Sequence, residues 1–247
     1  MTVFTYEKGR RGGACRDFLE SSGRLANFKM LTILPIPTTR DGVYINGSDK
    51  TLHSLAREAG EGEVFLGYGI PEWLVDVLSG AGAIVVDAER DGEFLNENAR
   101  LTALAVVCYL LSDGSVTPDE RRIGIVGYGR IGGALLRLLI PLGCAVTVYS
   151  TRESVVHCLN SSGIVSELVR DGSPLPECEL LLNTAPAPIF DTRASLPRGM
   201  KIIELAQGDN FGDLEVLRLP SLPNRYFPVS AGRAYAASLL RGLGGTI

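Results

Sequence analysis

The stretch between Arg121 and Arg152, RRIGIVGYGRIGGALLRLLIPLGCAVTVYSTR, limits the fold more than any other part of the chain. An apolar run, a G-x-G-x-x-G turn, an amphipathic run and a second apolar run follow one another, which is typical of a dinucleotide-binding β-α-β unit. Gly127 allows the tight turn, Gly129 lets a pyrophosphate approach the backbone, and Gly132 lets helix and strand pack closely. The residues expected to hold the pyrophosphate are Gly127, Tyr128, Gly129, Arg130, Ile131 and Gly132. The alternative is a glycine turn in an α/β unit that binds no nucleotide.

The end of the second apolar run bears on which dinucleotide binds. An NAD site usually has Asp or Glu there, which accepts hydrogen bonds from the ribose hydroxyls. This chain has Ser150, Thr151 and Arg152 instead, whose hydroxyls and guanidinium suit a 2′-phosphate. The sequence therefore favours NADP. Two alternatives stay open: Arg152 is only a solvated loop residue, or Glu153, one position later, reaches the ribose of NAD.

The rest of the chain alternates strand-like and helix-like runs, which predicts an α/β fold with parallel sheets. The expected strands are Thr2–Tyr6, Leu31–Leu34, Val64–Leu66, Ile84–Val86, Ile123–Gly127, Ala145–Ser150, Leu180–Asn183, Lys201–Leu205 and Val216–Leu219. The expected helices are Gly12–Ser21, Asp49–Ala59, Pro71–Ser79, Asn96–Ser112, Ile131–Leu142, Ser154–Asn160 and Ala231–Leu243.

Two domains are expected from this order of elements. Residues 1–95 should form a smaller flavodoxin-like α/β domain, and residues 96–230 a Rossmann-type domain with a doubly wound parallel sheet that binds NAD(P). A long helix at Asn96–Ser112 and the polar loop DGSVTPDE after it should link them, and residues 231–247 should pack back on the first domain. Ligands in such sheets bind at the carboxyl ends of the strands. On this ground Asn183, Thr184, Ala185 and Pro186 are expected to border the nicotinamide; the alternative is a plain turn.

Composition and charge exclude several functions. The net charge of −4 gives no electrostatic reason to bind nucleic acid or an anionic membrane. The apolar run Leu101–Leu111 is too short to span a bilayer, and the N-terminus does not resemble a signal peptide, so we expect a cytoplasmic protein. Five cysteines without C-x-x-C spacing and two histidines give no case for a metal site.

GYGRIGG and ENARLTALAVVCYLL resemble the D-2-hydroxyacid dehydrogenases. The chemistry of that family needs an Arg for the substrate carboxylate and a His as general acid and base. The segment KIIELAQGDN carries Gln207 near the position of the family's Arg, and no histidine follows His157. His53 lies in an expected N-terminal helix, so neither histidine is predicted to be catalytic. Interconversion of hydroxy and keto acids is therefore not expected.

A second resemblance extends from residue 31 to the end of the chain. The stretches that carry it, in order, are LTILPIPTTRDG, VFLGYGI, NENARLTALAVVCYLL, LLLNTAPAPIFD, KIIELAQGDNFGD and LPSLPNRYFPVSAGRAYAASLL. They are similar to segments of the dipicolinate synthase A-chain family, which shares the two-domain plan. The resemblance implies an enzyme of sporulating bacteria that makes pyridine-2,6-dicarboxylate from a dihydro- or hydroxy-tetrahydro-precursor. It also implies NADP-type nicotinamide chemistry and a partner, the flavoprotein B chain of the synthase.

A dicarboxylate substrate needs two groups of donors, which the sequence offers at two places. Thr38, Thr39 and Arg40 follow an expected strand and should project toward the cleft between the domains. Ser230, Ala231 and Gly232 should begin the last helix, whose N-terminus favours anions. The weaker candidates are Arg10, Arg11 and Arg233, and each arginine has the alternative of being a solvated loop residue. No catalytic residue is assigned.

The chain departs from the family pattern where Gln207 and Gly208 replace a segment with a basic residue and where the N-terminal third is shorter. Two other functions therefore stay open: a nucleotide-binding regulatory protein without chemistry, and an NAD(P)-dependent dehydrogenase of another small carboxylate. The apolar helix around Leu101–Leu111 could lie in a core or form the seam of a homo-oligomer.

Overall fold

The computed structural model describes residues 2–112, 117–193 and 195–244. The chain divides into two compact units, Met1–Asn98 with Pro223–Ile247, and Ala99–Leu222. Residues 113–116 of the expected polar loop and residues 245–247, expected to pack back with the last helix, lie outside the described residues. Each unit contains a parallel sheet with helices, so the α/β class expected from the sequence is confirmed.

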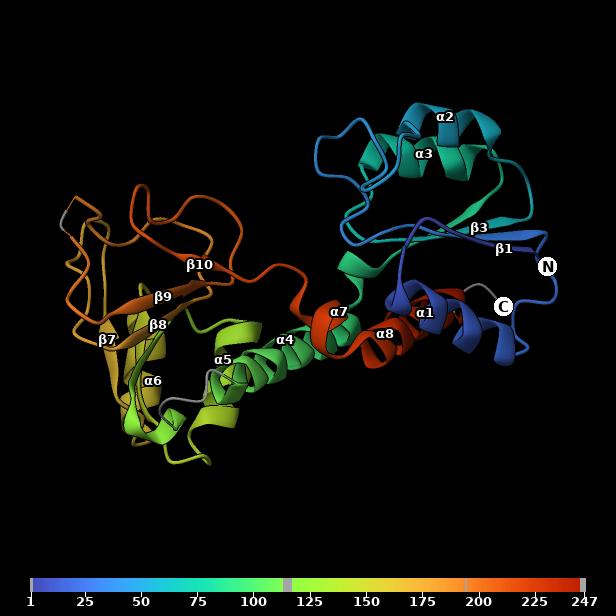
Figure 1. The fold of residues 1–247 in the computed structure, drawn as a ribbon. Helices are drawn as coiled ribbons and strands as arrows, with labels where there is room; N and C mark the ends of the chain where they lie inside the picture. The colour runs from blue at the N-terminus through green and yellow to red at the C-terminus, as the bar shows by residue number, and fades with distance from the viewer. Residues whose placement is uncertain (1, 113–116, 194, 245–247) are drawn as a thin grey trace. The chain divides into compact units, whose positions relative to one another are not determined.

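The first unit is a four-stranded parallel sheet in the order β1-β2-β3-β4. Its strands are β1 (Thr2–Thr5), β2 (Met30–Ile33), β3 (Glu63–Gly67) and β4 (Ile84–Asp87). Its helices are α1 (Arg10–Ser21), α2 (Leu52–Glu58), α3 (Glu72–Gly80) and α8 (Pro228–Leu243), with the 3-10 turn η1 (Ala88–Arg90). Figure 1 shows α1 and α8 side by side on one face of the sheet, and α2 with α3 on the other. Both faces of this sheet are therefore covered by helices.

The second unit is a six-stranded parallel sheet in the order β10-β9-β8-β5-β6-β7. Its strands are β5 (Arg122–Val126), β6 (Ala145–Ser150), β7 (Ser166–Leu168), β8 (Leu180–Asn183), β9 (Lys201–Glu204) and β10 (Leu217–Arg218). The helices are α5 (Arg130–Leu139) and α6 (Glu153–Ser161), with the 3-10 turn η2 (Pro118–Glu120). The helix α4 (Gly92–Ser112) runs from the first unit into the second. The helix α7 (Leu222–Tyr226) lies where the chain passes from the second unit back to the first. Because β5 pairs with β6 on one side and β8 on the other, the direction of winding reverses at β5, as in a doubly wound sheet.

Loops after β8 and β9 contribute to the core of the six-stranded sheet. The segments 184–193, 195–200 and 205–216 place apolar side chains in this core, among them Ile189, Phe190 and Phe211. The rings of Phe190 and Phe211 stack with centroids 6.5 Å apart. Aromatic side chains of this kind bury a large apolar area, even though the loops that carry them have no regular secondary structure. The loops after β8 and β9 are thus anchored parts of the domain.

The helix α8 packs closely on α1 because a glycine lies where the two helices meet. A Cβ atom on Gly232 would stand 2.4 Å from the carbonyl oxygen of Arg11. On the same helix the ring of Tyr235 is fully buried, and its hydroxyl donates to the carbonyl oxygen of Leu34 at 3.0 Å. The guanidinium of Arg241 donates to Asp91 at 2.6 Å, near the start of α4. The last helix is therefore an integral part of the first unit.

Several elements differ from the sequence prediction: α2 begins at Leu52 instead of Asp49, α5 ends at Leu139 instead of Leu142, and the short helix α7 was not predicted. Three further differences have a local reason. The helix α4 begins at Gly92 instead of Asn96, because the carboxylate of Asp91 accepts from the N–H groups of Glu93 and Phe94. The helix α8 begins at Pro228 instead of Ala231, and proline is favoured at the first helical position. The strand β7 was not predicted, since its three residues, SEL, are too few to show a period.

The close contact between α1 and α8 predicts the effect of two glycine substitutions. Gly232→Ala should lower the free energy of unfolding by about 2 kcal/mol, because its methyl group overlaps a backbone carbonyl and the helices must separate. Gly13→Ala, in α1, is the matched control, since a Cβ there meets nothing within 4 Å. It should stabilise the protein by up to about 1 kcal/mol through helix propensity. Urea unfolding followed by circular dichroism measures both, and equal effects of the two substitutions would contradict the close-packing account.

Candidate functional site

The glycine-rich turn after β5 has the geometry of a phosphate-binding loop. Gly127 has φ +86°, a left-handed conformation that favours glycine, and its N–H donates to the carbonyl oxygen of Tyr149 at 2.8 Å. A Cβ on Gly132 would stand 2.1 Å from the carbonyl oxygen of Gly127, so only glycine lets α5 start this close to the turn. A Cβ on Gly129 would meet nothing within 4 Å, which leaves open space above the backbone at that position.

The N-terminus of α5 faces this open space with its positive dipole end. Gly129 is the N-cap residue, and the first helical hydrogen bond runs from the N–H of Gly133 to its carbonyl oxygen at 2.9 Å. No acidic residue lies in the first turn, which contains Arg130 and Ile131, so no carboxylate of that turn repels an anion. A helix N-terminus of this kind binds phosphate through its amide groups and its dipole. The residues present therefore fit a pyrophosphate.

Arg152 folds back over the glycine-rich turn from the end of β6. Its guanidinium donates to the carbonyl oxygen of Tyr128 at 3.1 Å, and its backbone N–H donates to the hydroxyl oxygen of Ser150 at 3.1 Å. Ser150 is buried, whereas Thr151 and Arg152 are exposed. A positive charge is thus held next to the glycine-rich turn, while the hydroxyl of Ser150 supports the backbone. Glu153 begins α6, and its carboxylate lies 3.5 Å from the guanidinium of the exposed Arg170.

The loop after β8 is tied to the glycine-rich turn. The hydroxyl of Thr184 donates to the carbonyl oxygen of Val126 at 2.8 Å, and the carbonyl oxygen of Gly127 lies 3.3 Å away. The buried Asn183 accepts from the N–H of Ala185 at 3.2 Å and donates to its carbonyl oxygen at 3.1 Å. Asn183 and Thr184 therefore shape the backbone of the loop, and Ala185 and Pro186 are carried by it.

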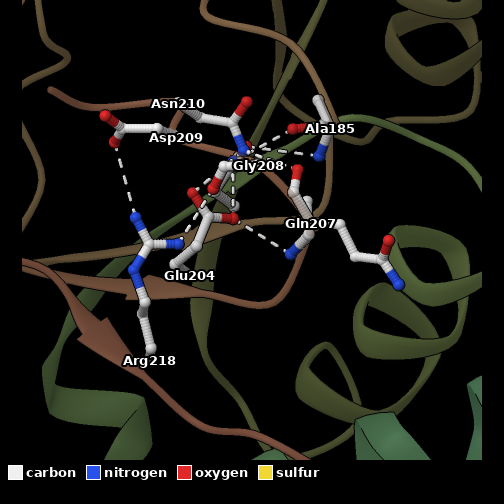
Figure 2. A network of polar contacts seen from close by, with 9 residues as sticks. Ala185, Glu204, Gln207, Gly208, Asp209, Asn210 and Arg218 are labelled. Carbon is white, nitrogen blue, oxygen red and sulfur yellow. Dashed lines mark hydrogen bonds and ion pairs between the residues drawn. The ribbon is translucent and has the colours of Figure 1, made fainter. Parts of the chain in front are cut away.

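A buried carboxylate, that of Glu204, joins the loops after β8 and β9 and was not predicted from the sequence. One oxygen accepts from the Nδ2 of Asn183 and from the N–H of Ala206, both at 2.9 Å. The other oxygen accepts from the Nδ2 of Asn210 at 3.1 Å. Figure 2 shows this network together with Arg218, whose guanidinium donates to the carbonyl oxygen of Gly208 at 2.9 Å. The sequence feature that could have indicated this network is the position of an acidic residue, Glu204, at the end of a buried strand.

Thr38, Thr39 and Arg40 lie in the loop after β2; Thr38 is buried, Thr39 is half-buried and Arg40 is exposed. The hydroxyl of the buried Thr38 accepts from the N–H of Tyr68 at 3.0 Å, so it links the loops after β2 and β3. The hydroxyl of Thr39 donates to the carboxylate of Asp41 at 3.2 Å. Hydrogen bonds from the N–H groups of Tyr44 and Val43 lower the pKa of Asp41, so this carboxyl stays ionised. The structure thus gives Thr38 and Thr39 a role in holding the loop.

Ser230, Ala231 and Gly232 fall inside the start of α8, which begins two residues before Ser230 at Pro228. Ser230 is exposed, whereas Ala231 and Gly232 are buried. The N–H of Ala231 donates to the carbonyl oxygen of Phe227 at 2.9 Å, so the helix itself uses this amide. Within this group, the Ser230 side chain is the one that solvent can reach.

The remaining sequence candidates divide into buried and exposed groups. Arg11 is buried and donates twice to the buried carboxylate of Glu7, at 3.0 Å through Nε and 2.9 Å through Nη2. The same carboxylate accepts from the N–H of Ile36 at 3.2 Å, so this ion pair joins the loops after β1 and β2. The exposed candidates are Arg10 and Arg233; His157, for which no catalytic role was predicted, is exposed as well. His53 packs against the ring of Trp73 with centroids 4.6 Å apart.

Metal-binding and membrane-spanning features are both missing from the described residues. Across residues 2–112, 117–193 and 195–244, no three His, Cys, Asp or Glu side chains come together as ligands of a metal ion. In the same part of the chain, every helix is too short or too polar to cross a membrane.

The phenol of Tyr149 lies at the end of β6, beside the glycine-rich turn. Burial raises its pKa to about 12, which keeps the phenol neutral at physiological pH. Its ring packs edge-on against Phe190, with centroids 6.4 Å apart. Tyr149 therefore contributes packing and no charge to this part of the site.

The fold and the glycine-rich turn define the class as a two-domain α/β protein with a Rossmann-type unit, like those of NAD(P)-dependent dehydrogenases. D-lactate dehydrogenase from Escherichia coli superposes with a TM-score of 0.53 at 15% identity, covering 100% of this chain and 98% of its own.

Among solved structures, the chain is similar in particular to the A chain of dipicolinate synthase. The protein from Bacillus halodurans superposes with a TM-score of 0.75 at 17% identity, covering 97% of this chain and 96% of its own. The protein from Bacillus subtilis gives 0.72 at 16%, covering 99% and 96%. No protein-family model matches the sequence, and no curated protein matches it. At these identities the likeness establishes the shared fold.

Proposed function

We propose that the chain is an NADP-dependent oxidoreductase that acts as the A chain of a dipicolinate synthase. In this proposal it converts a dihydrodipicolinate-type precursor to pyridine-2,6-dicarboxylate during sporulation. The observation that carries the cofactor part is the guanidinium of Arg152 held 3.1 Å from the carbonyl oxygen of Tyr128, beside an open helix N-terminus. The fold shared with two dipicolinate synthase A chains over nearly the whole length supports the reaction.

The residues of the second unit suit the parts of a dinucleotide phosphate. The amide groups at the start of α5 would hold the pyrophosphate, and Gly129 leaves room for it. Arg152 and the hydroxyl of Thr151 would hold the 2′-phosphate of NADP, since an arginine fork pairs well with phosphate oxygens. When bound, the nicotinamide ring supplies hydride transfer. Asn183 and Thr184 would fix the loop beside it.

The proposed substrate contacts in the first unit are Arg40 and Ser230. Both side chains are exposed, and both belong to segments at which the sequence resembles the A chain of dipicolinate synthase. Thr38, Ala231 and Gly232 would support these segments from inside. Arg11 is no longer a good candidate for a carboxylate, because the buried Glu7 already occupies two of its donors.

The proposed reaction asks for little acid-base catalysis by the protein. A dihydropyridine that gives up a hydride to the cofactor and a proton to water becomes an aromatic ring, whose stability favours the product. The protein then contributes mainly by holding the substrate in one orientation, which can supply a large part of the rate enhancement. The exposed His157 lies on α6, and no role is given to it.

A dehydrogenase of another small carboxylate is the second candidate. Two observations favour it. Gln207 is exposed where the resemblance would place a basic residue, and Arg11, which could have bound a carboxylate of the substrate, is buried. The two candidates share the cofactor site and differ only in the substrate, so the reaction assay separates them.

Arg152→Ala should weaken NADPH binding about tenfold or more and change NADH binding by less than about twofold. The charged hydrogen bonds to the 2′-phosphate are lost, and NADH lacks that phosphate. Calorimetric titration of both cofactors measures the difference.

Arg198→Ala is the matched control, because it removes another exposed positive charge from the same unit, ahead of β9. It should leave both affinities within about twofold of the unsubstituted chain. Equal losses for NADPH and NADH in Arg152→Ala would rule out selection of NADP by this residue.

With NADP⁺ and a dihydrodipicolinate mixture, the chain should produce pyridine-2,6-dicarboxylate and NADPH in equal amounts. The absorbance of the aromatic product and of the reduced cofactor are followed together, with and without a flavoprotein partner. Heat-denatured chain is the control for spontaneous oxidation. Absence of product under both conditions, with NADP⁺ bound, would overturn the proposed reaction and leave the other carboxylates to be tested.

A further inference from the structure

We infer that Glu204 is a positioning residue of the nicotinamide pocket: it holds the loops after β8 and β9 in one arrangement so that they can receive the nicotinamide. This inference rests on the proposed function and assigns a role to a residue outside the phosphate-binding turn.

Glu204 ends β9 and stands in register with Asn183, the last residue of β8. Only 3% of its surface is exposed. Its carboxylate accepts three hydrogen bonds, from the side-chain amides of Asn183 and Asn210 and from the N–H of Ala206, at 2.9, 3.1 and 2.9 Å. The donors come from the end of β8 and from the loop after β9, so one carboxylate connects both.

Through its partners the carboxylate fixes backbone on both sides. Asn183 binds both the N–H and the carbonyl oxygen of Ala185, in the loop after β8. The Nδ2 of Asn210 lies 3.3 Å from the carbonyl oxygen of Gln207, in the loop after β9. Figure 2 shows Ala185, Gln207 and Asn210 around Glu204. Rotation of this carboxylate would therefore change the hydrogen bonding of both loops at once.

The position of Arg152 indicates which half of a dinucleotide reaches these loops. The pyrophosphate belongs at the start of α5, after β5, and Arg152 marks the adenosine side at the end of β6. In the strand order β9-β8-β5-β6, the other half of the cofactor then lies over the ends of β8 and β9. The loops that Glu204 holds stand on that side.

A buried carboxylate is a costly way to support a fold. Its three donors are neutral N–H groups, and their hydrogen bonds offset the loss of solvation of the buried carboxylate. Apolar side chains of similar volume usually stabilise a core as well or better. The carboxylate adds an acceptor that fixes the orientation of two asparagine amides. We infer that this contributes more to the shape of a binding pocket than to the free energy of unfolding.

Glu204→Gln should weaken NADPH binding about tenfold. Glutamine has nearly the same size as glutamate, but its NH₂ group must face one of the donor groups. One of the two loops therefore loses its hydrogen bond to residue 204. Binding of the nicotinamide-free fragment, 2′-phospho-ADP-ribose, should stay within about twofold of the unsubstituted chain. In addition, the emission of NADPH at saturation should be enhanced less by the variant than by the unsubstituted chain. Calorimetry and fluorescence titration measure these effects.

Glu177→Gln is the control, because it removes an exposed carboxylate ahead of β8, at the opposite edge of the sheet. It should leave both ligands unaffected. Asn210→Ala releases only the loop after β9. It should also weaken the binding of NADPH and not that of the fragment, and it replaces Glu204→Gln in the test if that variant does not fold.

The outcomes separate this inference from the proposed function. Equal weakening of NADPH and of the fragment, no weakening of either, or failure of both variants to fold would contradict the role of Glu204 alone. Failure of the unsubstituted chain to bind either ligand would contradict the proposed function and the role of Glu204 with it.

Discussion

The contact between Gly132 and the carbonyl oxygen of Gly127 is the constraint on which the second unit depends. A side chain on Gly132 would push α5 away from β5, since its Cβ would stand 2.1 Å from that oxygen. With glycine at both positions, the start of α5 lies against the turn, Thr184 binds the same turn from the next strand, and Arg152 closes over it. The geometry of the glycine-rich turn is thus a consequence of backbone packing.

Polar side chains at the carboxyl ends of the strands mostly hold loops together. Thr38 joins the loops after β2 and β3, the ion pair of Glu7 and Arg11 joins those after β1 and β2, and Glu204 joins those after β8 and β9. In each case a buried group satisfies backbone or amide donors of the neighbouring loop, as buried polar groups must. The side chains of Arg40 and Arg152, by contrast, are exposed to solvent.

The fold could be predicted from the sequence where the information is local. The strands around the glycine-rich turn are apolar runs of the right length, and the glycines at 127, 129 and 132 identify the turn by their spacing. The links that Thr38 and Glu204 make between loops could not be predicted, because Tyr68 lies 30 residues from Thr38 and Asn183 lies 21 residues from Glu204, and only the paired strands bring them together. From the sequence, Gly232 was predicted to lie in an anion site, because the N-terminus of a helix attracts anions. Its close contact with α1 depends on how the two helices pack and could not be predicted.

The central claim is that the second unit holds a phosphate-bearing nicotinamide cofactor at the glycine-rich turn. Isothermal titration calorimetry of the full chain with NADP⁺ tests it most directly. The account predicts saturable heat with one cofactor per chain, and abolition of that heat when a bulky side chain replaces Gly129. Folded chain that gives no heat with NADP⁺ or NAD⁺ at millimolar concentration would contradict it.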